Sequence, residues 1–203
     1  MRVDFNISEK EASILKGTVE LLKTGKNPYS IKVSDIAAAA GVGKGTIYEY
    51  FQSKEEVLEK SILYSMQQEA ANLESSLRSY KGFSERLGVL CDYFIQSIQS
   101  EKSVFNMIIS SDGAMEMYPY GFAGKDGCDR MFGKINQIID LVLEPGKKEG
   151  KVASDNTDFY NRMVIKNIFA DIGHYMFMMR QYPDITLEDV KKDTLKMALK
   201  ALG

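Results

Sequence analysis

The sequence predicts an all-α protein with about nine helices, and three observations favour this fold class. The chain of 203 residues contains only four prolines, so few of its helices are forced to break. Apolar residues make up 44% of the chain and charged residues 27%, a balance typical of folded globular proteins. Apolar positions recur three and four residues apart, and no segment keeps the period of two that strands need.

The first helix is predicted to begin at Ser8 and to end near Gly25. Residues 8–11, Ser-Glu-Lys-Glu, have the pattern of a capping box, in which the serine accepts a hydrogen bond from the first turn. The apolar side chains that follow recur on one helical face: Ile14, Leu15, Val19 and Leu22. We expect that face to pack into a core.

Two short helices are expected next, over residues 33–40 and 44–51, joined by a glycine-rich turn. The first ends in four alanines, whose small side chains allow the second helix to cross closely over it. Gly41 supplies the left-handed conformation that a sharp turn requires. The spacing turns three apolar side chains inward: Ile36, Ile47 and Phe51.

The outward face of the second short helix is small, polar and aromatic. It carries Gly45, Thr46, Tyr48 and Glu49, with Lys44 and Tyr50 at its flanks. Near Gly43 the free backbone N–H groups of the helix start favour a phosphate, and glycines let another surface approach closely. A helix-turn-helix that inserts its second helix into the major groove of DNA needs these properties.

These residues resemble the TetR family of transcriptional regulators over about residues 29–58. The resemblance rests on Ile36-Ala37, Ala40-Gly41-Val42, Gly45-Thr46-Ile47-Tyr48 and Tyr50-Phe51-Gln52-Ser53-Lys54. It implies a helix-turn-helix DNA-binding domain at residues 1–52 and a ligand-binding and dimerisation domain at residues 53–203. It also implies DNA contacts by seven residues: Ser34, Lys44, Gly45, Thr46, Tyr48, Tyr50 and Lys54. To these the outward face adds Gly43 and Glu49.

The sequence departs from the family at Lys32, where many members carry threonine. A capping hydroxyl is lost there, although a lysine also reaches a phosphate. Glu49 has two interpretations: it accepts a hydrogen bond from a cytosine amino group, or it repels the DNA backbone and sharpens specificity. A competing interpretation places Tyr48 and Tyr50 in one aromatic core patch with Phe51, but Tyr48 lies off the inward face. Lys54 lies in the first turn of the following helix, where the positive end of the helix dipole disfavours a cation. A phosphate bound by Lys54 would explain why a lysine stands there.

The charge of this module predicts a dimer. Residues 1–60 contain nine Lys and Arg and nine Asp and Glu, so the module is neutral. Since salt-dependent affinity grows with the number of phosphates contacted, one module alone should bind DNA weakly. Two modules acting together on a pseudo-palindromic site would place their recognition helices roughly 34–36 Å apart, or a multiple of that distance.

The rest of the chain predicts further core helices. One begins at Ser53 and runs to about Arg78, and others cover residues 87–98, 104–109, 130–143, 159–179 and 186–201. Pro145-Gly146 is expected to end the fourth of these helices. Residues 110–127 mix glycines with methionines and aromatic residues, which suits either a loop packed on the core or the wall of a ligand cavity.

The last two helices are predicted to form the dimer interface. Residues 159–179 are apolar on more than one face, so that helix needs two burying partners. The family resemblance implies a four-helix bundle with the partner subunit. We expect nine residues to form the interface: Val164, Ile168, Ile172, Tyr175, Met179, Val190, Thr194, Met197 and Ala201.

A small apolar ligand is expected in the larger domain. Eight residues are predicted to line its cavity: Phe94, Phe105, Ile109, Tyr118, Met131, Ile135, Phe169 and His174. His174 is the sole histidine of the chain, and a structural or interface role for it stays open. The methionines fit an adaptable pocket as well as an ordinary core.

Composition and motifs exclude several function classes. No nucleophile with its base, metal-ligand cluster, phosphate loop or catalytic carboxylate pair is recognisable, so we expect no enzyme, cofactor or metal. The net charge is −2 and no apolar stretch is long enough to span a membrane, which favours a cytoplasmic protein. The predicted function is a homodimeric repressor that an apolar small molecule releases from a pseudo-palindromic operator. The alternative is a TetR-like co-regulator that binds a protein partner and no DNA.

Overall fold

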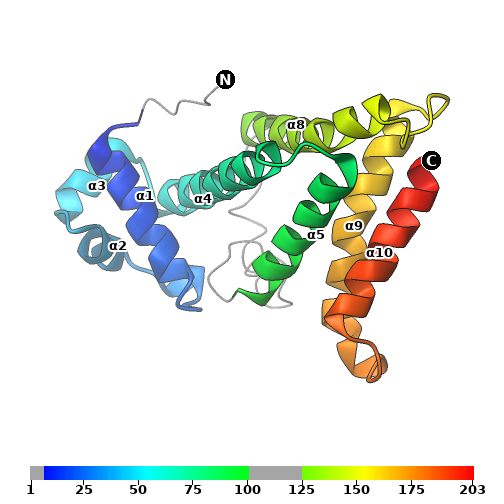
Figure 1. The fold of residues 1–203 in the computed structure, drawn as a ribbon. Helices are drawn as coiled ribbons and strands as arrows, with labels where there is room; N and C mark the ends of the chain where they lie inside the picture. Colours follow the sequence, from blue (N-terminus) through cyan, green and yellow to red (C-terminus); the bar gives the residue numbers. More distant parts are fainter. Residues whose placement is uncertain (1–6, 101–124) are drawn as a thin grey trace. The chain divides into compact units, whose positions relative to one another are not determined.

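The computed structural model describes residues 7–100 and 125–203, with the side chains of 125–132 excepted. Within these ranges it contains eight α-helices, two short 3-10 helices and no strand (Figure 1), which confirms the predicted all-α class. None of the helices in these ranges combines the length and the apolar composition that crossing a lipid bilayer requires. The described residues form two compact units, one up to Gln68 and one comprising Glu69–Ser100 and Arg130–Gly203.

The first unit is a small helical bundle. It contains α1 (Glu9–Leu22), the 3-10 turn η1 (Pro28–Ser30), α2 (Val33–Ala40), α3 (Lys44–Tyr50) and the first half of α4 (Lys54–Arg78). As predicted, Ser8 caps α1, its Oγ accepting from the N–H of Glu11 at 3.1 Å. The core of this unit is formed by apolar side chains from all four helices: Ile14, Leu22, Ile36, Ile47, Phe51, Val57 and Leu58.

Helices α1 and α2 cross closely at a glycine. A Cβ atom on Gly17 would lie 2.8 Å from the backbone N of Ala40 and 2.9 Å from the carbonyl carbon of Ala39. The hydroxyl of Ser13 donates to the carbonyl of Ala40 at 3.1 Å across the same crossing. The run of small alanines therefore brings α2 against α1, a contact that the sequence reasoning had placed between α2 and α3.

The second unit contains the rest of α4, α5 (Phe83–Gln99), α8 (Lys125–Lys148) from Arg130 onward, α9 (Asp158–Met178), the 3-10 turn η2 (Met179–Gln181) and α10 (Leu187–Leu202). Helices α9 and α10 lie side by side, and both pack on α5 (Figure 1). Their shared core contains Leu87, Leu90, Cys91, Ile168, Ile172 and Ala198. Thr186 and Asp189 form a reciprocal capping box that begins α10 where the sequence predicts it.

Helix α8 departs from the prediction at both ends. It begins at Lys125, before the expected residue 130, and it continues through Pro145 to Lys148. The expected end at Pro145-Gly146 is therefore wrong. A proline inside a helix removes one backbone hydrogen bond, and here the side chain of Arg86 supplies a substitute donor from α5.

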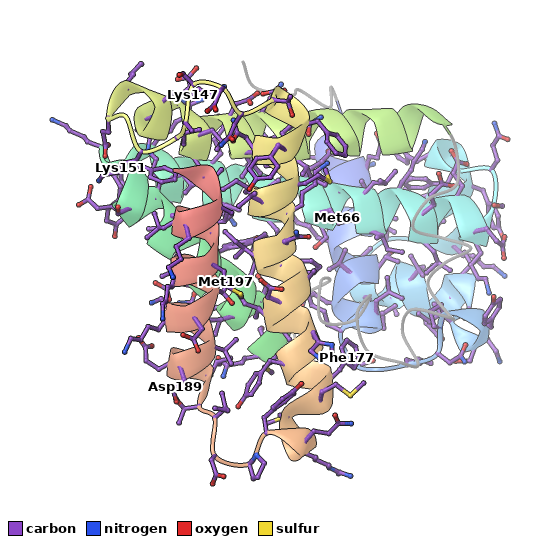
Figure 2. The ribbon with its side chains drawn as sticks, turned by 90° about the vertical axis from the view of Figure 1, so that its right-hand side faces the viewer. Met66, Lys147, Lys151, Phe177, Asp189 and Met197 are labelled. Atoms are coloured by element: carbon purple, nitrogen blue, oxygen red, sulfur yellow. The ribbon has the colours of Figure 1, made fainter. Side chains whose placement is uncertain are left out.

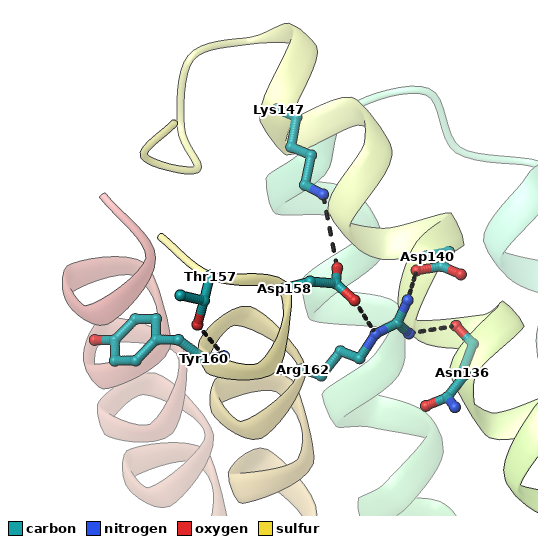
Figure 3. A network of polar contacts seen from close by, with 7 residues as sticks. All are labelled: Asn136, Asp140, Lys147, Thr157, Asp158, Tyr160 and Arg162. Carbon is teal, nitrogen blue, oxygen red and sulfur yellow. Dashed lines mark hydrogen bonds and ion pairs between the residues drawn. The ribbon is translucent and has the colours of Figure 1, made fainter. Parts of the chain in front are cut away.

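Arg162 joins α9 to α8 through two acceptors on α8, and it also pairs with an acid on its own helix (Figure 3). Its guanidinium donates to the carboxylates of Asp158 at 2.7 Å and Asp140 at 2.8 Å, and to the carbonyl of Asn136 at 3.3 Å. The hydrogen bond from Arg162 holds the pKa of Asp158 below its ordinary value. Because the planar guanidinium satisfies acceptors on both helices, it fixes the register of α9 on α8.

Candidate nucleic-acid interface

The turn between α2 and α3 has the sharp geometry that the sequence predicts. Gly41 ends α2 in the left-handed region, with φ of +67°, and the N–H of Val42 reaches the carbonyl of Ala37 at 3.0 Å. Gly43 then adopts an extended conformation and begins α3. The turn thus directs α3 away from α2 within two residues.

Burial separates the inner and outer faces of α3 as expected. Ile47 and Phe51 are buried against the core of the first unit, whereas Tyr48 is 53% exposed. Lys44, Gly45 and Glu49 are exposed beside it, and Gly43 is exposed at the helix start. Tyr48 therefore lies outside the aromatic core patch that was the competing interpretation.

Thr46 and Tyr50 occupy the borders of this face, because both are half-buried. The ring of Tyr50 lies 6.5 Å from that of Phe51, so Tyr50 packs partly on the core. We define the outer surface of α2 and α3, including the start of α4, as the recognition surface. It comprises Lys32, Ser34, Gly43, Lys44, Gly45, Thr46, Tyr48, Glu49, Tyr50 and Lys54.

The start of α2 is stabilised without the hydroxyl that the family often has. The carboxylate of Asp35 accepts from the backbone N–H of Lys32 at 3.2 Å and from Nζ of Lys26 at 2.8 Å. The Lys26 contact, followed by that of Lys32, holds the pKa of Asp35 below its ordinary value. The side chain of Lys32 is not needed as a cap, and it is exposed together with Ser34.

Lys54 has partners within the protein. Its Nζ donates to the carbonyl of Tyr29 at 3.2 Å and lies 3.9 Å from the carboxylate of Glu55. A phosphate is therefore not required to explain a cation in this first turn. The contact joins η1 to the start of α4, and it places Tyr29, 58% exposed, beside the recognition surface. Sequence reasoning missed Tyr29, for which an aromatic residue in the Asn-Pro-Tyr turn was the available signal.

The expected ligand residues are only partly described. Phe94 of α5 and Phe169 of α9 are half-buried and meet edge to face, with ring centroids 4.9 Å apart. Ile135 of α8 is half-buried, and His174 of α9 is exposed with its ring 6.5 Å from that of Tyr182. Phe105, Ile109 and Tyr118 lie outside the described residues, as does the side chain of Met131.

The nine residues predicted to form the dimer interface differ in how deeply their side chains are buried. Ile168 and Ile172 are 1% and 0% exposed, and Thr194 is buried with them, so their own chain already covers them. The prediction that these three residues form the dimer interface is therefore wrong, because their side chains are already buried within one chain. Val164, Tyr175, Val190 and Ala201 are half-buried, whereas Met179 and Met197 are exposed.

Several apolar side chains of α9 and α10 that were not predicted are exposed. Phe159 is 72% exposed, and four others share its character: Tyr160, Phe177, Met178 and Leu199. Figure 2 labels Met197 on α10 and Phe177 near the end of α9. The second apolar face of residues 159–179 was visible in the sequence, but only burial shows which of the two faces is free.

Comparisons with known proteins agree with this geometry. Residues 14–60, from α1 to the start of α4, match the family of bacterial regulatory proteins called the tetR family. None of the curated proteins matches the chain.

Solved structures share the fold over most of the chain. The regulator FadR from Bacillus subtilis, in complex with stearoyl-CoA, has a TM-score of 0.67 at 19% identity, covering 95% of this chain and 99% of its own. The superantigen PfiT has a TM-score of 0.68 at 20% identity, covering 94% and 96%. SmeT, repressor of a Stenotrophomonas maltophilia multidrug efflux pump, has a TM-score of 0.60 at 16% identity, covering 97% and 90%.

At these identities the structural likeness establishes the fold alone, and the relatives differ in function. The family match covers the helix-turn-helix region alone, and this region contains the residues of the recognition surface described above. Members of this family are regulators and not enzymes. Residues 14–60 therefore form a helix-turn-helix domain of the tetR family of bacterial regulatory proteins.

Proposed function

We propose that this protein is a homodimeric repressor in the cytoplasm, which binds a pseudo-palindromic operator and leaves it when an apolar small molecule binds. The observation that carries the proposal is the contrast between the two faces of α3. Ile47 and Phe51 anchor the helix in the core, and Tyr48 with its neighbours presents polar and aromatic groups outward. This is the arrangement that a recognition helix in a major groove requires.

The recognition surface offers two kinds of contact in this proposal. Lys32, Lys44 and Lys54 meet phosphates, which position the protein without reading sequence. Ser34, Thr46, Tyr48 and Glu49 face base edges, and Gly43 and Gly45 allow close approach. Tyr50 contributes from the border of the surface.

Dimerisation supplies the second recognition helix. The natural surface for a second copy consists of exposed apolar residues of α9, η2 and α10: Phe159, Phe177, Met179 and Met197. Large apolar side chains that are free in one protomer gain most from burial by a partner. The half-buried Val164, Tyr175, Val190 and Ala201 lie at the edge of this proposed interface.

An apolar ligand is supported by the aromatic pair of Phe94 and Phe169, which is only half-buried within the second unit. The stearoyl-CoA bound by Bacillus subtilis FadR is an example of an apolar chain held by a protein of this fold. Thermodynamic linkage makes this effect reciprocal. A ligand that weakens operator binding by roughly 1–3 kcal/mol binds the DNA-free protein more tightly than the DNA-bound protein by the same free energy.

The test is fluorescence anisotropy of the purified protein with random DNA duplexes at two salt concentrations, followed by selection and sequencing of the retained duplexes. A pseudo-palindromic consensus and a steep fall of affinity with salt are expected. A folded, dimeric protein that enriches no sequence would contradict the proposal.

A second candidate function is a co-regulator that binds a protein partner and no DNA. Two observations favour it: the first sixty residues are neutral, and Lys54 and Lys26 already have partners in the protein. It predicts that duplex affinity is weak at every salt concentration, which the same titration measures.

A further inference from the structure

Glu49 is an acid on a surface proposed to meet a polyanion. Three other carboxylates of the first unit have cations beside them: Glu20 pairs with Lys23 at 3.0 Å, Asp35 with Lys26 at 2.8 Å and Glu56 with Lys60 at 2.8 Å. No Lys, Arg or His of the described ranges forms an ion pair with Glu49. Its charge is therefore uncompensated within the described part of the chain.

The space on the outer face of α3 beside Glu49 is open, because the residue one helical turn earlier is Gly45. Gly45, Tyr48 and Glu49 are separated by three and four residues, so they share one face of the helix. Side chains of a helix lean toward its N-terminus, which directs the Glu49 side chain over Gly45. A Cβ added at Gly45 would have no atom within 4 Å, so the space beside Glu49 is open.

A carboxylate that enters this space has only acceptor oxygens, and DNA offers it few donors. Phosphates repel it, as do the N7 and O6 acceptors of guanine and the O4 acceptor of thymine. Adenine presents an amino donor next to its N7 acceptor. Cytosine presents the N4 amino group and no acceptor on its major-groove edge.

We propose that Glu49 determines specificity by accepting a hydrogen bond from the N4 amino group of one cytosine in each operator half-site. The proposal rests on the proposed function and names the base that this part of the surface reads. Repulsion between Glu49 and DNA that lacks the cytosine adds to the discrimination.

The experiment compares operators selected by the wild-type protein and by three variants. Glu49→Ala is expected to lose the preference for cytosine at one symmetric position, by roughly ten- to a hundredfold. Glu49→Gln is expected to move that preference to adenine, because an amide pairs with N6 and N7 of adenine. Glu20→Gln is the matched control, since it neutralises one exposed carboxylate on α1 and should leave the consensus unchanged.

A chemical probe tests the same contact without changing the protein. N4-methylcytosine at that position replaces the free amino hydrogen by a methyl group, so it should weaken binding of the wild-type protein and not of Glu49→Ala. A double-mutant cycle built from these four affinities isolates the contact.

The outcomes separate this inference from the proposed function. A wild-type protein that selects no operator overturns both. An operator whose base preferences are the same for the wild-type protein and Glu49→Ala overturns only the role of Glu49. A uniform rise in affinity for all duplexes in Glu49→Ala, with unchanged preferences, also overturns it, because it reduces Glu49 to general repulsion.

Discussion

The Nη1 atom of Arg86 donates a hydrogen bond of 2.5 Å to the carbonyl oxygen of Leu141. In a regular helix that oxygen accepts from the N–H four residues later, but residue 145 is proline and has none. The Nε atom of the same guanidinium donates to the carbonyl of Tyr80 at 2.8 Å, which fixes its position. One side chain of α5 thus compensates the interruption and lets α8 continue to Lys148.

Arg86→Ala should therefore destabilise the second unit by about 1–3 kcal/mol, because the Leu141 carbonyl would be left without a donor. The free energy of unfolding from urea titrations measures this. Pro145→Ala restores the missing N–H, so Arg86→Ala should cost less in the Pro145→Ala background. Equal costs in the two backgrounds would show that Arg86 does not act through this carbonyl.

Gly17→Ala should destabilise the first unit. Its new Cβ would meet the backbone of Ala39 and Ala40 under 3.0 Å, where no flexible side chain can yield. We expect a net loss of about 1–2 kcal/mol, since overpacking outweighs the roughly 1 kcal/mol that alanine gains over glycine in a helix. Gly45→Ala is the matched control, because its Cβ meets nothing and stability should not fall. A Gly17→Ala variant as stable as the wild-type protein would contradict the close crossing.

Tyr48→Ala should weaken binding to the selected operator by roughly tenfold or more, because the phenol combines a hydrogen-bonding tip with an apolar body. Anisotropy titrations measure this. The control is Tyr80→Ala, which removes another exposed tyrosine side chain, from the second unit, and should leave the affinity for the operator unchanged. Unaltered operator affinity in Tyr48→Ala would mean that the recognition face is misassigned.

Met197→Glu should shift the protein toward monomers, raising the dimer dissociation constant by roughly tenfold or more, because an unpaired charge would be buried in an apolar interface. Sedimentation velocity across a range of concentrations measures the change. Lys192→Gln alters the net charge by the same one unit on the exposed side of α10 and should leave the dimer intact. Dimers of unchanged stability in Met197→Glu would place the interface elsewhere.

Cys91 should resist thiol reagents in the native state. It is fully buried, and burial, with the charge of Asp92 adding to it, raises the pKa of its thiol to about 12. Because the thiolate is the reactive form, almost none is present at pH 8. Labelling with a maleimide in a Cys128→Ser variant, with and without urea, isolates this residue. Rapid labelling in the folded protein would contradict its burial.

Local signals in the sequence predicted the helix starts and the recognition turn. Ser8 and Thr186 cap helices through hydrogen bonds to residues three positions away, and Gly41 turns the chain through its own backbone conformation. The alternation of buried Ile47 and Phe51 with exposed Tyr48 follows from the helical period. For this reason the division of α3 into a buried and an exposed face was predictable from the sequence.

The sequence by itself therefore determined the helical class, the caps and the outward face of α3, because each depends on residues within about one helical turn. Only the tertiary structure decided that α8 passes Pro145, that Lys54 meets the carbonyl of Tyr29, and that Ile168 and Ile172 lie inside the protomer while Phe159 lies outside. Those outcomes depend on partners distant in the sequence, and a helical pattern shows which residues share a face but not which neighbour covers it.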